Sequence, residues 1–236
     1  MITTFLFDLD GTLLPMDQDC FIKAYMGGLA AKMAPHGYES SRLIKSIWAG
    51  TEAMARNDGS RINEDLFWDT FSSLYGKDVR QDEPIFLDFY ENEFQNVKNS
   101  CGFDSCAKIV IDLLKKQGIR IALATNPLFP AVATHSRIRW AGLNPEDFEW
   151  ITTYENSRRC KPNPDYYRDI LDILKVRPEE CVMVGNDVTE DMIAAQLGMQ
   201  VFLLTDCLIN KHNLDISQYP HGDFKALLDF IGGLNT

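Results

Sequence analysis

The sequence predicts an α/β fold, in which a doubly wound parallel sheet carries a small inserted domain made only of helices. From about residue 101 onward, short apolar runs alternate with amphipathic helical segments, which is typical of a parallel sheet covered on both faces. Between about residues 17 and 99, four amphipathic segments follow one another without a convincing strand, which indicates a helical bundle. We therefore expect a discontinuous core domain over residues 1–14 and 101–236, and a helical cap domain over residues 15–100.

The first strand is expected over residues 2–7, where an apolar run ends abruptly at Asp8 and Asp10. Side chains two positions apart in a strand point the same way, so these carboxylates share a face if the strand continues. Gly11 permits a tight turn directly after them. Two carboxylates at the end of a buried strand repel each other unless a cation lies between them. Mg²⁺ is the simplest candidate, because it is bound by a few carboxylates together with water and substrate phosphate. The alternative is that both aspartates only cap a turn.

The helical prediction for residues 15–100 rests on four apolar stripes with helical spacing. The stripes begin at Phe21, Leu43, Leu66 and Ile85. We expect their aromatic side chains to form the core of the cap rather than a binding site. The polar turn at residues 56–61 is a candidate for a loop that selects substrate, although such turns also occur without any function.

Helices and strands are expected to alternate strictly in the second part of the chain. A helix over residues 105–117 is expected to have Ser105 as its N-cap and Gly118 as its end. Further helices are expected at about residues 130–140, 164–175, 186–198 and 224–231, and strands at residues 119–124, 150–153, 181–185 and 200–204. Ligands of open α/β sheets bind beyond the carboxyl ends of the strands, so the residues just after these strands are the candidates for a site.

Polar side chains follow four of these strands. They are Asp8 and Asp10 after the first strand, Thr125 and Asn126 after the second, Lys161 after the short third, and Asn186 and Asp187 after the fourth, with Asp191 one helical turn further on. Carboxylates, a lysine and a small hydroxyl thus converge on one edge of the sheet. Turn capping by the first two aspartates does not predict this convergence.

These motifs, in this order, resemble those of the haloacid dehalogenase-like (HAD) hydrolase superfamily. Most members of that superfamily look like magnesium-dependent phosphatases. The resemblance covers residues 1–14 and about 101–228, whereas residues 15–100 match the family's C1-type helical cap in position and helical character only. It implies a Rossmann-like core and a phosphomonoester hydrolase that acts on a small intracellular phosphorylated metabolite through an aspartyl-phosphate. A phosphomutase similar to β-phosphoglucomutase, or a non-catalytic binding module, are the alternatives.

The resemblance also implies a role for each residue of the motifs. Asp8 is the implied nucleophile and Asp10 the general acid and base, Thr125 with the N–H groups of Leu9, Gly11 and Asn126 holds the phosphoryl oxygens, and Lys161 offsets the negative charge. The implied ligands of Mg²⁺ are Asp8, Asp10 through its carbonyl, and Asp187, with Asn186 and Asp191 in support. Asn186 stands where many members carry an aspartate, and we prefer Asp187 as the acidic ligand because an amide is a weaker, neutral one.

Composition and charge narrow the classes of function. The net charge of −11 argues against a nucleic-acid binder, which needs a basic face. No apolar run is long enough to span a membrane, and the N-terminus lacks the basic region of a signal peptide. The six cysteines show no metal-binding spacing, and we expect them to be reduced thiols of a cytoplasmic protein. The sequence makes no prediction about the oligomeric state.

Arg158 and Arg159 directly precede the lysine of the third motif. They are candidates for contacting an anionic substrate, but solvated surface arginines are at least as common.

Overall fold

The computed structural model describes residues 1–76 and 78–234. Its centre is a six-stranded parallel sheet with the order β3-β2-β1-β4-β5-β6. The strands are β1 (Thr4–Phe7), β2 (Arg120–Leu123), β3 (Trp150–Ile151), β4 (Cys181–Gly185), β5 (Gln200–Leu204) and β6 (His221–Gly222). The predicted fold class, a parallel sheet with a helical insertion, is confirmed.

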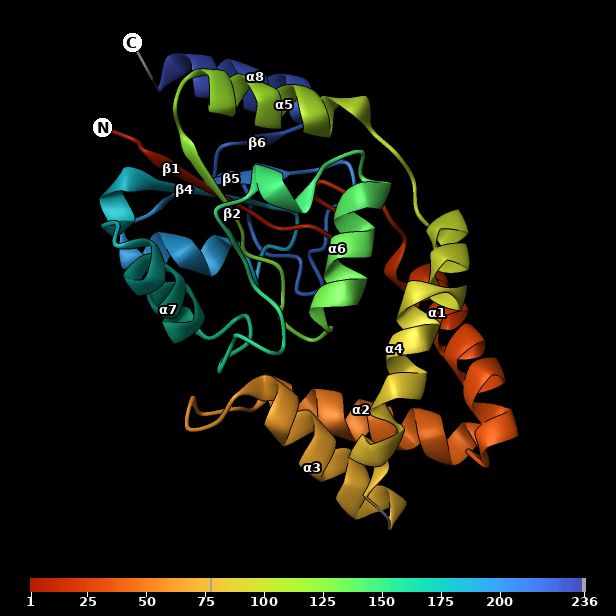
Figure 1. The fold of residues 1–236 in the computed structure, drawn as a ribbon. Coiled ribbons are helices and arrows are strands. Elements are labelled where there is room, and N and C mark those ends of the chain that lie inside the picture. Colours follow the sequence, from red (N-terminus) through yellow and green to blue (C-terminus); the bar gives the residue numbers. More distant parts are fainter. Residues whose placement is uncertain (77, 235–236) are drawn as a thin grey trace.

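Successive side chains along each strand point to opposite faces of the sheet, and helices cover both of these faces. Phe5 and Phe7 of β1 belong to a buried cluster that includes residues of α5 (Ser105–Lys116), α6 (Ala131–Trp140) and α8 (Phe224–Gly233). Leu6 points to the other face, where α7 (Pro164–Leu174) and the 3-10 helix η6 (Met192–Leu197) pack. Helices α5 and α8 lie side by side at the top of Figure 1. The near-continuous apolar strands of the sequence are explained by this double burial.

The chain leaves the sheet after β1 and returns to it at α5. In between it forms α1 (Gln18–Met33), α2 (Ser40–Ala55), α3 (Asn63–Tyr75) and α4 (Glu83–Glu91), with the 3-10 helices η1 (Ala34–His36), η2 (Val79–Asp82) and η3 (Glu93–Ser100). Each of the four apolar stripes of the sequence falls on one of the four α-helices. These segments, called the helical insert below, lie to one side of the sheet (Figure 1).

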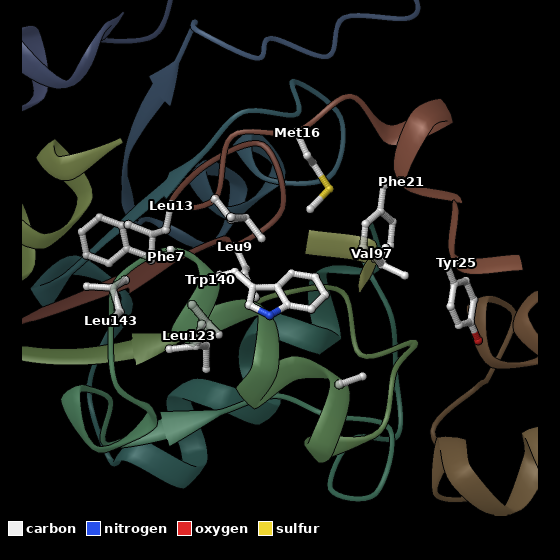
Figure 2. Packing of buried hydrophobic residues seen from close by; sticks show 14 of the residues in the cluster. Phe7, Leu9, Leu13, Met16, Phe21, Tyr25, Val97, Leu123, Trp140 and Leu143 are labelled. Atoms are coloured by element: carbon white, nitrogen blue, oxygen red, sulfur yellow. The ribbon is translucent and has the colours of Figure 1, made fainter. Parts of the chain in front are cut away.

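The two chain segments that join the insert to the sheet are themselves paired. Met16 and Cys101 form an antiparallel bridge, and the N–H of Gly102 donates to the carbonyl of Pro15 at 2.7 Å. One buried cluster continues from Phe7 of β1 past Trp140 to Phe21 and Tyr25 of α1 (Figure 2). The insert therefore shares a core with one face of the sheet, and its separation as a domain over residues 15–100 stays a prediction.

Local details differ from the expectation in several places, beginning with shorter first and third strands, Thr4–Phe7 and Trp150–Ile151. Asp104, not Ser105, is the N-cap of α5, because its carboxylate accepts a hydrogen bond from Cys106 N at 2.8 Å. The segment expected as a helix before Gly198 forms the 3-10 helix η6 rather than an α-helix. Strand β6 was not expected, since two residues of backbone pairing to β5 leave no apolar run to detect.

Two more elements are short 3-10 turns that precede strands, η4 (Pro145–Asp147) before β3 and η5 (Pro178–Glu180) before β4. No helix in the described part of the chain is both long enough and apolar enough to cross a membrane.

Candidate active site

The strand order places the predicted site residues together. Strands β2, β1 and β4 are neighbours and run parallel, so their carboxyl ends meet at one edge of the sheet. Asp8, Asp10, Thr125, Asn126, Asn186, Asp187 and Asp191 all line one cavity of about 250 Å³ between this edge and the helical insert. The predicted convergence on one edge of the sheet is therefore present in the structure.

Lys161 lies buried between two carboxylates. Its Nζ is 2.9 Å from Asp8 Oδ1 and 2.6 Å from Asp191 Oδ1, and only 1% of its side chain is exposed. Burial acts to lower the pKa of Lys161, but the charges of Asp191 and Asp8 outweigh it and raise that pKa well above the ordinary value. The lysine is consequently held in its charged form, with its ammonium directed at Asp8.

Asp191 fixes both the lysine and the loop that follows β4. Its Oδ2 accepts a hydrogen bond from the main-chain N–H of Asp187 at 2.9 Å, while its Oδ1 binds Lys161. A Cβ atom on Gly185 would collide with this carboxylate, so a residue without a side chain is needed at the end of β4. Burial and the nearby charge of Asp8 raise the pKa of Asp191, against the opposing effect of Lys161. Asp191 is thus placed to support the lysine.

Thr12 and Asn186 connect the loops after β1 and β4. The Thr12 hydroxyl lies 2.9 Å from Asn186 Oδ1 and 3.2 Å from Asp8 Oδ2, so it donates to one or the other. Asn186 Nδ2 donates to the carbonyl of Cys207 at 2.7 Å. Gly11, with a φ of 86°, leaves space for this amide, because a Cβ there would meet Asn186 Nδ2. Both polar ends of Asn186 are therefore used within the protein.

Arg137 is a site residue that the sequence reasoning missed. It lies on α6, it is 1% exposed, and its guanidinium forms an ion pair with Asp10 Oδ2. The guanidinium also lies over the Phe129 ring, 4.4 Å from its centroid, at a cation–π distance. Burial raises the pKa of Asp10 above its ordinary value, the Arg137 charge lowers it, and the Asp8 charge raises it. The other oxygen of Asp10, Oδ1, is buried and has no hydrogen-bond partner among the described residues.

A signal for Arg137 was present in the sequence. It falls one helical turn after Ala133 and one before Ala141, both buried, on the apolar face of the expected helix. An arginine on the buried face of a helix is rare unless it is paired, and the carboxylates on the adjacent sheet edge are its natural partners.

Thr125 and Asn126 lie at the end of β2. The carbonyl of Thr125 accepts hydrogen bonds from the hydroxyls of Thr152 and Tyr166 at 2.7 and 2.8 Å, which fixes the main chain at this point. Asn126 Nδ2 donates to Glu190 Oε2 at 3.0 Å. Glu190, a second residue that the sequence reasoning did not single out, also lines the cavity, and burial raises its pKa.

The main-chain amides after Asp8 are not equivalent. The N–H of Gly11 donates to the carbonyl of Leu14 at 2.8 Å, so this amide is engaged within its own turn. The amides of Leu9 and Asp10 donate to no other residue in the described part of the chain. Of the N–H groups expected to bind phosphoryl oxygens, that of Gly11 is engaged, whereas those of Leu9 and Asn126 donate to no main-chain carbonyl of the described residues, and the N–H of Asp10 is available beside them.

The donor set at the sheet edge fits a hard, oxygen-binding cation. Asp187 Oδ1 accepts hydrogen bonds from the N–H groups of Thr189 and Glu190 at 2.7 and 2.9 Å, which orients the carboxylate and leaves Oδ2 available. The main-chain carbonyl of Asp10 accepts no hydrogen bond from the described residues. Within residues 1–76 and 78–234, no three His, Cys, Asp or Glu side chains form a metal cluster. The expected Mg²⁺ ligands do not require a cluster of three such side chains, because they are the carboxylates of Asp8 and Asp187 and the main-chain carbonyl of Asp10.

Arg158 and Arg159 do not line the cavity. Arg159 pairs with Asp169 at 2.8 Å, and Arg158 donates to the carbonyl of Ser60 at 3.4 Å. The turn at residues 56–61 contacts these arginines and is likewise absent from the cavity wall. Of the two alternatives that the sequence left open for the turn and for the arginines, the structure favours the one without a role at the cavity.

Comparisons with known proteins show the family and the fold of the chain. The family of haloacid dehalogenase-like hydrolases matches residues 2–198. Pyrophosphatase PpaX of Bacillus cereus is 26% identical over 196 residues, which make up 83% of this chain and 79% of that protein.

Three solved structures share the fold over nearly their whole length. A 2-haloacid dehalogenase from Pseudomonas syringae has a TM-score of 0.65 at 17% identity, covering 99% of this chain and all of its own. A HAD phosphatase from Thermococcus onnurineus has a TM-score of 0.62 at 18% identity, covering 98% and 99%. The HAD-hydrolase YfnB from Bacillus subtilis, solved with bound magnesium, has a TM-score of 0.57 at 19% identity, covering 100% and 99%.

Proposed function

The chain belongs to the haloacid dehalogenase-like hydrolase family, and from this premise we propose that it is a magnesium-dependent phosphomonoester hydrolase with Asp8 as its nucleophile. The observation that carries the proposal is the pair of contacts that Asp8 makes at the wall of the cavity. Oδ1 lies 2.9 Å from Lys161 Nζ and Oδ2 lies 3.2 Å from the Thr12 hydroxyl. A carboxylate oriented in this way is a preorganised nucleophile.

Asp8 attacks the phosphorus atom of the substrate and forms an aspartyl-phosphate, while the bond from phosphorus to the leaving oxygen breaks. A water molecule then attacks the same phosphorus atom and releases inorganic phosphate and the free carboxylate. Two displacements, each with a lower barrier, replace one difficult displacement.

Asp10 moves the proton in both steps. In the first step its carboxylic acid protonates the leaving alkoxide, and in the second its carboxylate takes a proton from the attacking water. Its raised pKa supports the first role, and the ion pair with Arg137 supports the second, because the guanidinium stabilises the carboxylate.

The phosphoryl oxygens need donors that are fixed before the substrate arrives. The available N–H groups of Leu9 and Asp10, the Thr125 hydroxyl and Asn126 are the groups that we assign to them, and Lys161 offsets the combined charge of Asp8 and the phosphate. Asp191 holds Lys161 in place through the 2.6 Å contact.

We assign Mg²⁺ to Asp8, the carbonyl of Asp10 and Asp187, whose oxygens match its ligand preference. The ion supplies charge stabilisation and orients the phosphoryl group when bound. Asn186 is not assigned as a ligand, because its Oδ1 faces the Thr12 hydroxyl and its Nδ2 holds Cys207.

The substrate is proposed to be a small phosphorylated metabolite, as the size of the cavity supports. A phosphomutase on the same scaffold remains the alternative enzyme, and it would require a bisphosphate for turnover. A dehalogenase has no use for Asp10 as an acid or for the set of oxygen ligands around Asp187.

The test is hydrolysis of an aryl phosphate by the wild type and by Asp8→Asn, each with Mg²⁺ and with excess chelator. We expect turnover only in the wild type with Mg²⁺, and loss of at least about 10³-fold in Asp8→Asn, because the amide cannot act as the nucleophile. Undiminished turnover in Asp8→Asn removes the proposed role of Asp8. Turnover that is independent of the metal removes the magnesium assignment.

A further inference from the structure

The cavity beside Asp8 has one strongly polar end, and its other walls are mainly aromatic and aliphatic. Its polar end is the sheet edge with the carboxylates, and the remaining wall comes mainly from the four α-helices of the insert. Those helices contribute Phe21 and Met26 from α1, Ile47 and Trp48 from α2, Trp68 from α3 and Leu87 from α4. The part of a substrate that lies beyond its phosphoryl group therefore contacts aromatic and aliphatic side chains.

Cations are scarce in this wall. From the described part of the insert, one charged side chain lines the cavity, and this is the acid Glu83. Lys211 is the one lysine or arginine among the described lining residues, and it lies on the exposed loop after β5. The two buried cations near the site are already paired, Lys161 with Asp8 and Asp191, and Arg137 with Asp10. A second anionic group on the substrate would face the insert without a partner, which is costly at a buried position.

Two large apolar side chains at the cavity also remain exposed in the structure. Trp48 is 45% exposed and Leu87 is 38% exposed, and both line the cavity from different helices. Exposed apolar groups that converge on a concave site indicate a ligand that covers them.

We propose that the leaving group of the substrate is an uncharged, apolar alcohol, aromatic or short and aliphatic, which the insert binds through these side chains. The inference rests on the proposed phosphomonoesterase activity and names its substrate class. The size of the cavity is suitable, because about 150 Å³ of apolar space suffices for benzene and this cavity has about 250 Å³. The proposed apolar leaving group distinguishes the substrate of this chain from that of PpaX, which is named as a pyrophosphatase, because pyrophosphate carries a second charged phosphate.

The test compares kcat/KM for three phosphate monoesters and for pyrophosphate, with Mg²⁺ present. Benzyl and butyl phosphate carry apolar leaving groups, whereas phosphoglycolate and pyrophosphate carry charged ones. We expect benzyl phosphate to exceed phosphoglycolate by about tenfold or more, because small apolar contacts in a pocket give ratios of this size. A preference for phosphoglycolate or pyrophosphate overturns the inference while leaving the phosphatase activity intact.

Trp48→Lys places a cation on the exposed wall of the cavity without touching the sheet edge. We expect it to lower the ratio of kcat/KM between benzyl phosphate and phosphoglycolate by about tenfold, through the lost ring contact and the added charge. Leu74→Ala, at an exposed position of α3 outside the cavity, is the matched control and leaves the ratio unchanged. An unchanged ratio in Trp48→Lys overturns the inference.

Binding of benzyl alcohol, measured by calorimetry, separates the two proposals if no ester is hydrolysed. Absence of turnover with all of these compounds would overturn the proposed function but not the inferred apolar binding site. Benzyl alcohol binding with a negative heat-capacity change, weakened in Trp48→Lys, then still supports an apolar alcohol site. No binding of the alcohol overturns it.

Discussion

Arg137 is the residue whose role the structure changes most. The ion pair between its guanidinium and Asp10 couples α6 to the group that we assign as the acid and base. The charge of Arg137 lowers the pKa of Asp10, against the larger effect of burial. Removal of that charge should therefore raise the pKa of Asp10 further.

Arg137→Gln is expected to shift the pH profile of kcat/KM for an alkyl phosphate. The alkoxide must be protonated by Asp10, so activity is lost as the pH rises through the pKa of Asp10. A higher pKa moves this basic limb to higher pH, and kcat falls by about tenfold or more because Asp10 loses the support for its carboxylate form.

Arg137→Lys is the control, because it keeps the positive charge. Its basic limb should stay near that of the wild type. Thermal unfolding midpoints show whether both proteins are folded. If they are, equal pH profiles for the wild type and Arg137→Gln would show that the ion pair does not act on catalysis.

At this scale the sequence indicated which side chains meet at the sheet edge, but not which groups each of them contacts. Asp8, Thr125, Lys161 and Asp187 could be found because they follow the ends of strands. The engagement of the Gly11 amide by Leu14 could not, since it depends on the conformation of one turn. The use of both ends of Asn186 likewise depends on Thr12 and on the loop at Cys207.

At the scale of elements, η3, the last element of the insert, packs against α6 beside the sheet. The Phe94 ring lies 5.0 Å from the Trp140 ring of α6 and 5.9 Å from the Tyr25 ring of α1, as measured between ring centroids. Phe94 is fully buried, so it packs on both parts of the molecule at once.

Phe94→Ala is expected to lower the free energy of unfolding by about 3–5 kcal/mol, the usual cost of removing a buried aromatic ring. Phe103→Ala, at a position that is 65% exposed, should change it by less than about 0.5 kcal/mol. Urea unfolding of both variants measures the difference. Similar losses in the two variants would show that Phe94 does not join the insert to the sheet.

Elements with a strong periodic pattern were predictable, and short ones were not. The apolar run at residues 181–185 became β4 with the same bounds, and Pro164 opens α7 as expected. By contrast, β6 has two residues, and η6 replaced an α-helix in a segment where Asp191 must reach Lys161. Tertiary contacts rather than local preference decide such segments.

At the scale of the whole molecule, the family and the fold class were both predictable from the order of the motifs, because each motif follows a strand of one parallel sheet. The character of the cavity was not predictable. The aromatic stripes of the insert were expected to form only its core, yet several of these residues also line the cavity beside Asp8. Which side of each helix faces the sheet is set by packing across the two parts of the chain, which periodicity alone does not show.

Mg²⁺ binding at the sheet edge should stabilise the folded protein. A ligand present at 100 times its dissociation constant adds about 2.7 kcal/mol, which for a chain of this size raises the unfolding midpoint by roughly 5–10 °C. Asp187→Ala should lose this stabilisation, whereas Asp229→Ala, at an exposed position of α8, should keep it. Thermal unfolding with Mg²⁺ or chelator is the measurement, and an equal Mg²⁺ effect in both variants would place the ion elsewhere.

In the proposed reaction, Asp8 carries the phosphoryl group during turnover. This role is tested most directly by quenching the enzyme with borohydride while it hydrolyses a phosphate ester, which reduces an acyl phosphate to the alcohol. We expect mass spectrometry then to find homoserine at position 8, only when substrate and Mg²⁺ were both present. Rapid turnover with an unmodified Asp8, or with the modification on another carboxylate, would contradict it.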